Sequence, residues 1–213
     1  MMSYYSDAIT EKSLQILQSL VSGLDFVLVG GWAVNFYTNN QKSTDIDIAI
    51  TVDKLSYFKQ FGVKKYDNAP LYYAYIGETR IDLLVNGITD KMLTVPISSV
   101  LSDYVTIGGF KVAGKEILLI LKMCAYFSPD KQKIEKDMID VDSMLFYAGI
   151  NMPKVAEYTK KYKIDSRKSF GGMLEYLDKG RNLWQFITNT KEEYETLLSK
   201  TKKAIKPYIR SGI

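Results

Sequence analysis

The stretch from Phe26 to Ile50, FVLVGGWAVNFYTNNQKSTDIDIAI, constrains the fold of this chain more than any other segment. Its short β-branched apolar run ends at a pair of glycines, which predicts a buried strand, a tight turn and a short helix. The alternating residues that follow predict a second strand, in which side chains two positions apart share a face. Asp45 and Asp47 therefore point to one face, and Ile46 and Ile48 point to the other, which we expect to face the core.

The rest of the chain follows a pattern typical of an α+β protein. We expect a small mixed β-sheet core flanked by helices over residues 1–113, and a helical region packed on it over residues 114–213. The remaining strands are expected over residues 71–77, 79–87 and 103–114, the last as a hairpin that turns at Gly108-Gly109. Helices are expected over residues 7–21, 31–40, 53–62, 115–127, 130–149, 153–162, 167–188 and 191–206.

The chain has no histidine and one cysteine, Cys124, and these counts exclude several kinds of chemistry. No intrachain disulfide, histidine-containing zinc site, Ser-His-Asp triad or Cys-His dyad is available. The apolar neighbours of Cys124 predict a buried thiol. Metal binding and acid-base chemistry must therefore use carboxylates, lysine or tyrosine.

The net charge of +4 is spread unevenly along the chain. Residues 1–150 carry 14 Lys and Arg against 17 Asp and Glu, a net charge of −3, whereas residues 151–213 carry 14 against 7, a net charge of +7. This asymmetry favours a part over residues 1–150 that uses a metal or another cation, and a part over residues 151–213 that faces an anion. A solvated helical surface explains the asymmetry equally well.

Neither the first residues of the sequence nor its apolar runs indicate a membrane protein. The first residues, MMSYYSDAITEK, lack the apolar core of a signal peptide. The longest apolar run, EILLILKMCAYF, contains a lysine and is too short to span a bilayer. We therefore expect a soluble, cytoplasmic protein that does not use a membrane.

The two aspartates of the second strand favour a metal site. Like charges held a few ångströms apart repel each other unless a cation lies between them, and Mg²⁺ prefers such oxygen ligands, with Mn²⁺ as an alternative ion. Asp82 interrupts an apolar strand, where a carboxylate is costly unless it is paired or functional. It is the best candidate for a third ligand. The alternative is that Asp45 and Asp47 only mark the wet face of a half-exposed sheet.

The glycine pair, Gly30 and Gly31, favours phosphate binding. Glycine lets the backbone approach a ligand closely, and the start of the following helix offers unpaired N–H groups to an anion. Neither the GxxxxGK[ST] loop nor the GxGxxG fingerprint occurs in the chain. A tight turn without a ligand is the alternative interpretation.

The segment VGGWAVNFY…STDIDIAI resembles the DNA polymerase β-like nucleotidyltransferase superfamily, most of all its minimal and toxin-type members, including abortive-infection nucleotidyltransferase toxins. The resemblance covers roughly residues 24–142. It implies that Gly30 and Gly31 hold a triphosphate and that Asp45, Asp47 and Asp82 bind two Mg²⁺ ions. Toxin-like members often carry a lysine in the helix after the sheet and then an RxxKDxxD-like segment. The matching residues here are Lys122, Lys133, Lys136, Asp137 and Asp140.

The chain departs from the superfamily pattern in three places. Many members have Gly-Ser where this chain has Gly30-Gly31, and an arginine just before the aspartate pair is replaced by a stretch that includes Gln41. Lys133 stands where arginine is common. Lys42 can substitute for the missing arginine as a point charge. The polar residues of this stretch that we expect to contact the nucleotide are Lys42, Ser43 and Thr44.

The resemblance implies transfer of a nucleoside monophosphate from an NTP, such as ATP, to an acceptor hydroxyl. Asp45, Asp47 and Asp82 are the expected catalytic metal ligands, and Asp82 could also accept the proton. Lys122 and Lys136 are expected to neutralise the pyrophosphate. For Lys136 and its charged neighbours, a solvated charge face on a helix is an alternative.

The acceptor and the partners stay open at this stage. The lysine- and tyrosine-rich tail suits tRNA or another RNA, and it equally suits an ordinary amphipathic surface. A small molecule or a protein side chain are further candidate acceptors. The rival function is a non-catalytic nucleotide- or partner-binding module on the same fold, for instance in a complex with an antitoxin or a regulatory protein.

Overall fold

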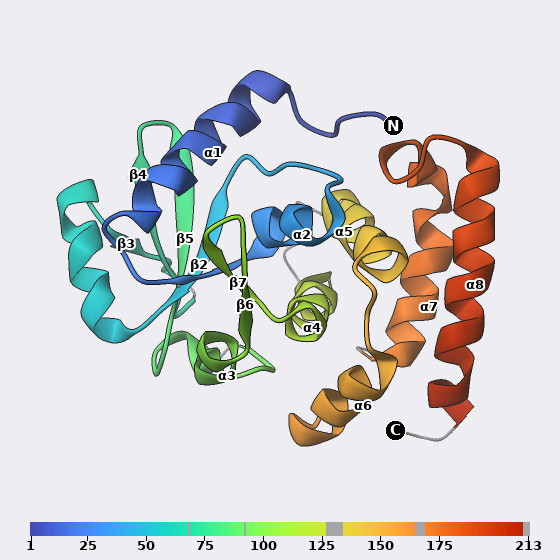
Figure 1. Ribbon diagram of the computed structural model, residues 1–213. Helices are drawn as coiled ribbons and strands as arrows, with labels where there is room; N and C mark the ends of the chain where they lie inside the picture. The colour runs from blue at the N-terminus through green and yellow to red at the C-terminus, as the bar shows by residue number, and fades with distance from the viewer. Residues whose placement is uncertain (68, 92, 127–133, 165–168, 211–213) are drawn as a thin grey trace. The chain divides into compact units, whose positions relative to one another are not determined.

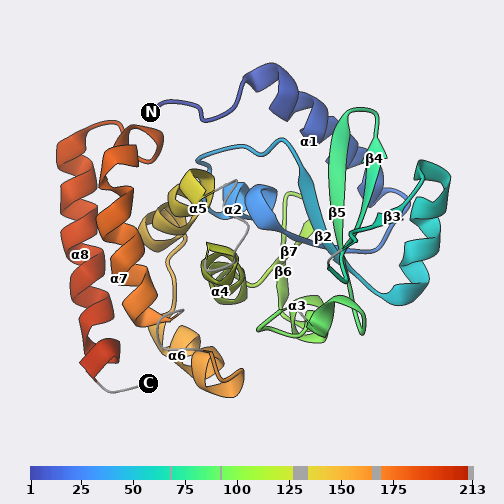
Figure 2. The same ribbon diagram turned by 180° about the vertical axis from the view of Figure 1, so that it is seen from behind.

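The computed structural model describes residues 1–67, 69–91, 93–126, 134–164 and 169–210 (Figures 1 and 2). The fold is α+β, as predicted, with a seven-stranded mixed sheet, flanking helices and a C-terminal helical region. The chain divides into two compact units. The sheet unit comprises Tyr5–Phe36 and Lys42–Gly114, and the helical unit comprises Met1–Tyr4, Tyr37–Gln41 and Lys115–Ile213.

The sheet unit contains every strand that the structure describes. Its strands are β1 (Val27–Val29), β2 (Ile46–Ile50), β3 (Lys64–Lys65), β4 (Tyr72–Ile76), β5 (Thr79–Val85), β6 (Tyr104–Ile107) and β7 (Phe110–Ala113). They follow the order β3-β4-β5-β2-β1-β7-β6. The central strand β2 pairs antiparallel with β1 and parallel with β5, so the sheet is mixed. Strand β2 therefore lies between the strand that precedes the glycine pair and the strand that carries Asp82.

Helices of the sheet unit stabilise the strands. They are α1 (Asp7–Val21), most of α2 (Gly30–Thr38), the 3-10 helices η1 (Val52–Phe61) and η2 (Thr89–Lys91), and α3 (Ile97–Ser102). Ile46 and Ile48 of β2 are fully buried, which confirms the predicted core face of this strand. The buried indole of Trp32 in α2 donates a hydrogen bond of 2.9 Å to the Ser13 hydroxyl of α1. This bond fixes α2, and hence the glycine pair at its start, against a second helix.

The helical unit is built from the second half of the chain. Its helices are α4 (Lys115–Tyr126), α5 (Ile134–Tyr147), α6 (Met152–Lys161), α7 (Phe170–Lys179), the 3-10 helix η4 (Gly180–Phe186) and α8 (Lys191–Arg210). Helix α5 packs against α4 and α7, and α7 runs beside α8 in both views (Figures 1 and 2). None of the helices in the described residues is both long and apolar enough to cross a bilayer.

Gln41 belongs to the helical unit and ties separate segments of it together. Its side-chain amide donates hydrogen bonds of 2.7 Å to the carbonyl oxygens of Met2 and Phe186, and its carbonyl accepts one of 2.7 Å from the Tyr4 amide. The side chain is buried. Gln41 thus has a structural role, next to the residues that we expected to contact the nucleotide.

The structure differs from the predicted elements in several places. The segment 53–62 forms a 3-10 helix rather than an α-helix, although it ends at Gly62 in the left-handed conformation. The predicted helix over 167–188 divides at Gly180, where a Cβ would collide with the buried carboxylate of Asp142. Strand β3 and helix α3 were not predicted. Cys124 is only half-buried, and residues 127–133 lie outside the described residues.

Candidate active site

The strand register brings the three predicted carboxylates together at one place on the sheet. Asp47 of β2 lies opposite Asp82 of the parallel strand β5, and opposite Val29 of β1 on its other side. Asp45 precedes β2 by one residue and shares the face of Asp47. Neighbouring strands are about 4.8 Å apart, so these side chains are within reach of a common ligand.

Gly30 is required by its close approach to Asp47. Its φ of +65° lies in the left-handed region, which favours glycine. A Cβ at this position would lie 2.7 Å from the Asp47 Cβ and would collide with the carboxylate. The absent side chain therefore allows the start of α2 to lie beside Asp47. Gly31 follows in the first turn of α2 and is buried.

Arg80 lies between two of the carboxylates, and the sequence analysis missed it. Its Nη2 atom is 2.8 Å from Oδ2 of Asp82 and 3.4 Å from Oδ2 of Asp45. The two carboxylates are largely buried, with 13% of the Asp45 side chain and 16% of the Asp82 side chain exposed. The signal was present: Arg80 precedes Asp82 by two positions, which puts both side chains on one face of the strand.

Tyrosines line the sheet on the far side of Asp82. The Tyr66 hydroxyl donates a hydrogen bond of 3.1 Å to Oδ1 of Asp82, so both oxygens of this carboxylate have a donor. The Tyr66 ring lies 4.7 Å from that of Tyr73, which is opposite Asp82 on β4, and Tyr73 lies 6.0 Å from Tyr75. The carboxylates therefore lie between the glycine turn on one side and an aromatic wall on the other.

Burial and charge act in opposite directions on this site. Burial raises the pKa of Asp82 above its usual value, and the nearby Asp45 adds to that shift, while Arg80 and Tyr66 oppose it. Burial alone would lower the pKa of the Arg80 guanidinium. The nearby Asp82, Tyr66 and Asp45 outweigh burial, so the pKa is raised overall. Burial, followed by Asp82, raises the pKa of Tyr66 to about 12. Asp82 therefore holds a proton more readily than an ordinary aspartate does.

The side chains fit a divalent cation in their chemistry. Three carboxylates offer the hard oxygen donors that Mg²⁺ prefers. Asp45 and Asp82 already converge on one cation, the Arg80 guanidinium. Across the described ranges, no group of three or more His, Cys, Asp or Glu side chains is arranged tightly enough to form a metal centre. An ion at Asp82 therefore requires Arg80 to release that carboxylate.

The three residues before Asp45 that we expected to contact the nucleotide have different surroundings. The buried Ser43 hydroxyl donates a hydrogen bond of 3.0 Å to Oδ1 of Asp45 and so orients that carboxylate. Lys42 forms an ion pair of 3.2 Å with Asp7 at the start of α1. Thr44 is half-buried. Of these residues, only Ser43 contacts a predicted metal ligand.

The two predicted lysines lie in the helical unit, within a network of ion pairs between α4 and α5. Lys122 is 3.0 Å from Asp137 and 2.8 Å from Asp140, with 13% of its side chain exposed. Lys136 pairs with Asp140 one turn along α5, and both are buried. The alternative of a solvated charge face is therefore wrong for Lys136 and Asp140. Lys133 lies outside the described residues.

The charges of this network stabilise each other. Burial lowers the pKa of Lys136, and Asp140 opposes that shift. Burial opposes ionisation of Asp140, but Lys122 and Lys136 outweigh it and hold the pKa of the carboxyl below its usual value. Because Lys122 and Lys136 share the buried Asp140 carboxylate, we infer that the main role of Lys136 is to stabilise the helical unit.

The comparisons with known proteins identify the fold. No protein-family model and no curated protein matches the sequence. Among solved structures, the chain is similar to the aminoglycoside nucleotidyltransferase ANT(2")-Ia, whose crystal structure was determined in complex with adenylyl-2"-tobramycin. The TM-score is 0.50 at 17% identity, over 74% of this chain and 98% of that one. The chain therefore has a nucleotidyltransferase fold.

Proposed function

We propose that this protein is a divalent-metal-dependent nucleotidyltransferase that transfers a nucleoside monophosphate from an NTP to an acceptor hydroxyl. The observation that carries the proposal is the register that places Asp47 opposite Asp82, with Asp45 two residues away and the Gly30 turn beside them. The similarity to a nucleotidyltransferase fold supports it. The finer resemblance to toxin-type members stays part of the proposal.

Asp45, Asp47 and Asp82 are the residues that would hold Mg²⁺, or Mn²⁺ in its place. When bound, two such ions neutralise the triphosphate and lower the pKa of the acceptor hydroxyl. The convergence of Asp45 and Asp82 on the Arg80 cation supports this assignment. Arg80 would then be available to pair with phosphate oxygens, for which its planar guanidinium is well suited.

The triphosphate would bind on the β1 side of the aspartates. Helix α2 begins at Gly30, and its first N–H groups lack partners within the helix, so they can donate to phosphate oxygens. The helix dipole adds to this attraction. Gly30 and Gly31 are proposed as the cradle. Ser43 would act through Asp45, whereas Lys42 and Thr44 are proposed as contacts to the outer part of the nucleotide.

The acceptor would then approach from the β4 side, where the tyrosines lie. Asp82 is the carboxylate on that side whose pKa burial raises, so it is the proposed acceptor of the hydroxyl proton. Lys122, part of whose side chain is exposed, is proposed to neutralise the pyrophosphate. The burial of Lys136 supports a structural role more strongly than a direct contact with the nucleotide.

The acceptor class is open to experiment. The molecule in complex with ANT(2")-Ia is adenylyl-2"-tobramycin, which makes a small polyhydroxylated molecule one candidate for this chain. An RNA end and a protein hydroxyl are the others. Incubation with each α-³²P-labelled NTP and Mg²⁺, in the presence of RNA, protein or metabolite fractions, identifies the fraction that becomes labelled.

The matched variants for this assay are Asp47→Asn and Asp25→Asn, which remove one carboxylate each from the sheet unit. Asp25 is exposed and pairs with Lys111, away from the strand register described above. We expect Asp47→Asn to abolish transfer and Asp25→Asn to retain it, with both variants folded by circular dichroism. Full transfer by Asp47→Asn rejects the proposal. Binding of NTP by the wild-type protein without pyrophosphate release across all fractions supports the non-catalytic module instead.

A further inference from the structure

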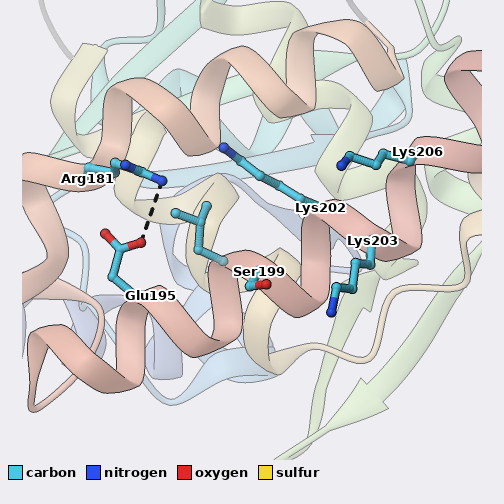
Figure 3. Close-up of a pocket in the computed structure, with 7 residues that line it drawn as sticks. Arg181, Glu195, Ser199, Lys202, Lys203 and Lys206 are labelled. Carbon is cyan, nitrogen blue, oxygen red and sulfur yellow. Dashed lines mark ion pairs between the residues drawn. The ribbon is translucent and has the colours of Figure 1, made fainter.

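Helix α8 and η4 line an open hollow that the proposed transfer reaction does not use. Its volume is about 210 Å³. The polar residues that line it are Arg181 from η4 and Glu195, Ser199, Lys202, Lys203 and Lys206 from α8. Figure 3 shows these side chains around the hollow, with the ion pair between Arg181 and Glu195 dashed. We call this site the basic hollow.

The basic hollow carries an excess of positive charge. Arg181 pairs with Glu195 at 3.5 Å, and Lys202 pairs with Asp178 of α7. Lys203 and Lys206 are exposed, and neither has an ion pair with any other residue that the structure describes. The chain from Thr196 to Arg210 contains five Lys and Arg and no acidic residue. The hollow therefore attracts an anion.

The size and shape of the site favour a chain of phosphates. A second hollow of about 540 Å³ adjoins the first and shares Glu195, Ser199 and Lys203 with it, while Lys200 adds another cation. The first hollow is smaller than the roughly 300–1,000 Å³ of sites that enclose whole ligands. It has room for one phosphate group, and the neighbouring phosphates of the same strand would lie along α8. From this geometry we propose that the basic hollow binds the phosphate backbone of a nucleic-acid strand.

The packing of α8 favours a nucleic acid over a lipid surface. The apolar side of the helix, including Tyr194, Leu198 and Ile205, is buried inside the helical unit. A helix that binds a membrane surface inserts an exposed apolar face between the lipids, whereas Ile209 is the one exposed large apolar side chain among the described residues of α8. None of the described residues that line the two hollows is aromatic, so we expect no base stacking on them. Binding should therefore depend on phosphates and tolerate any base sequence.

Fluorescence anisotropy with labelled single-stranded RNA and DNA of about 16 nucleotides tests the proposal. The protein is used as the full chain, in EDTA and without NTP, so the outcome does not depend on nucleotidyl transfer. Lys203→Gln/Lys206→Gln should weaken binding about tenfold at about 50 mM salt. It should also reduce the slope of log K against log salt by about 1.4, at about 0.7 per lost phosphate contact. RNA and DNA affinities compared on the wild-type protein identify which strand is preferred.

The matched control is Lys160→Gln/Lys191→Gln, which removes the same charge from exposed positions outside the hollow. We expect this variant to bind as the wild-type protein does. Glu195→Gln removes the acidic residue of the hollow and should strengthen binding severalfold. Equal losses in both lysine pairs, or no loss in Lys203→Gln/Lys206→Gln, overturn the proposal. Tighter binding to phosphatidylserine vesicles or to polyglutamate than to either strand overturns it as well.

Discussion

The Arg80 guanidinium lies 2.8 Å from the Asp82 carboxylate, two positions along the same strand. The same nitrogen is 3.4 Å from Asp45 on the neighbouring strand segment, so one internal cation bridges two of the three carboxylates. The side chain of Arg80 is about one-third exposed, which leaves it room to move away. Arg80 therefore competes with any metal ion that binds Asp82.

Substitution Arg80→Gln should increase the stabilisation of the protein by Mg²⁺. An ion pair of this exposure is worth on the order of 1 kcal/mol. Its loss should lower the apparent dissociation constant for Mg²⁺ about fivefold. The measurement is the shift of Tm with Mg²⁺ concentration. The control Arg80→Gln/Asp82→Asn should lose this gain, and an unchanged Mg²⁺ response in Arg80→Gln would contradict the competition.

Gly30→Ala should destabilise the protein more than Gly62→Ala. Both glycines have a positive φ, +65° and +63°, so alanine introduces similar backbone strain of roughly 1–2 kcal/mol at either position. Only at Gly30 would the new Cβ collide with Asp47, because no atom lies within 4 Å of it at Gly62. Urea denaturation measures the difference, and nucleotide binding should be lost in Gly30→Ala alone. Equal destabilisation of Gly30→Ala and Gly62→Ala would contradict the prediction, because it would mean that the Asp47 side chain moves away from the new Cβ at no cost in free energy.

Asp142 should make the protein less stable as the pH rises. Burial raises its pKa from 3.8 to about 7, opposed by the hydrogen bond from Tyr194 and by Lys202. The folded state therefore binds more protons than the unfolded state, and the free energy of unfolding falls as the pH rises from about 4 to about 7. Asp142→Asn should remove this fall, because the amide does not ionise. Urea denaturation across that pH range measures it.

Asp140→Asn, on the same helix, is the control, because the pKa of Asp140 is shifted in the opposite direction. Lys122 and Lys136 outweigh burial and lower the pKa of Asp140. Its contribution to the free energy of unfolding is present above the unfolded pKa and is lost as the pH falls through the lower, folded value. In Asp140→Asn, the part of the fall in the free energy of unfolding at acidic pH that Asp140 causes should therefore be absent. The same pH dependence in both variants would rule out these assignments.

Lys136→Met should cost about 3 kcal/mol of the free energy of unfolding, because it breaks a buried ion pair with Asp140. A double-mutant cycle with Asp140→Leu measures the coupling directly. We expect the double variant to be more stable than the sum of the single losses predicts, since no uncompensated buried charge remains. Strictly additive losses would place the two charges in separate environments.

Local patterns predicted most of the sheet unit. Alternation located β2, the glycine at Gly77 located the β4–β5 turn, and Gly108 with Gly109 located the β6–β7 hairpin. These features depend on neighbours in sequence, so they can be read without a fold. Strand β3 was missed because it has only two residues, too few to show an alternating pattern. Helix α3 was missed because it packs against β2, which is distant in sequence. At Gly180, where the predicted helix splits, a Cβ would collide with the Asp142 carboxylate of another helix, and no local pattern reveals that contact.

By itself, the sequence determined that Asp45 and Asp47, two positions apart at the start of a strand, point to one face and that a flexible glycine turn precedes them, because both follow from backbone geometry over a few residues. Only the tertiary structure decided that β5 lies parallel to β2, with Asp82 opposite Asp47. Hydrogen bonds between strands about thirty residues apart set that register, and no local pattern encodes it. The same register brings Arg80 against Asp45 and makes a cation of the chain itself part of the candidate active site.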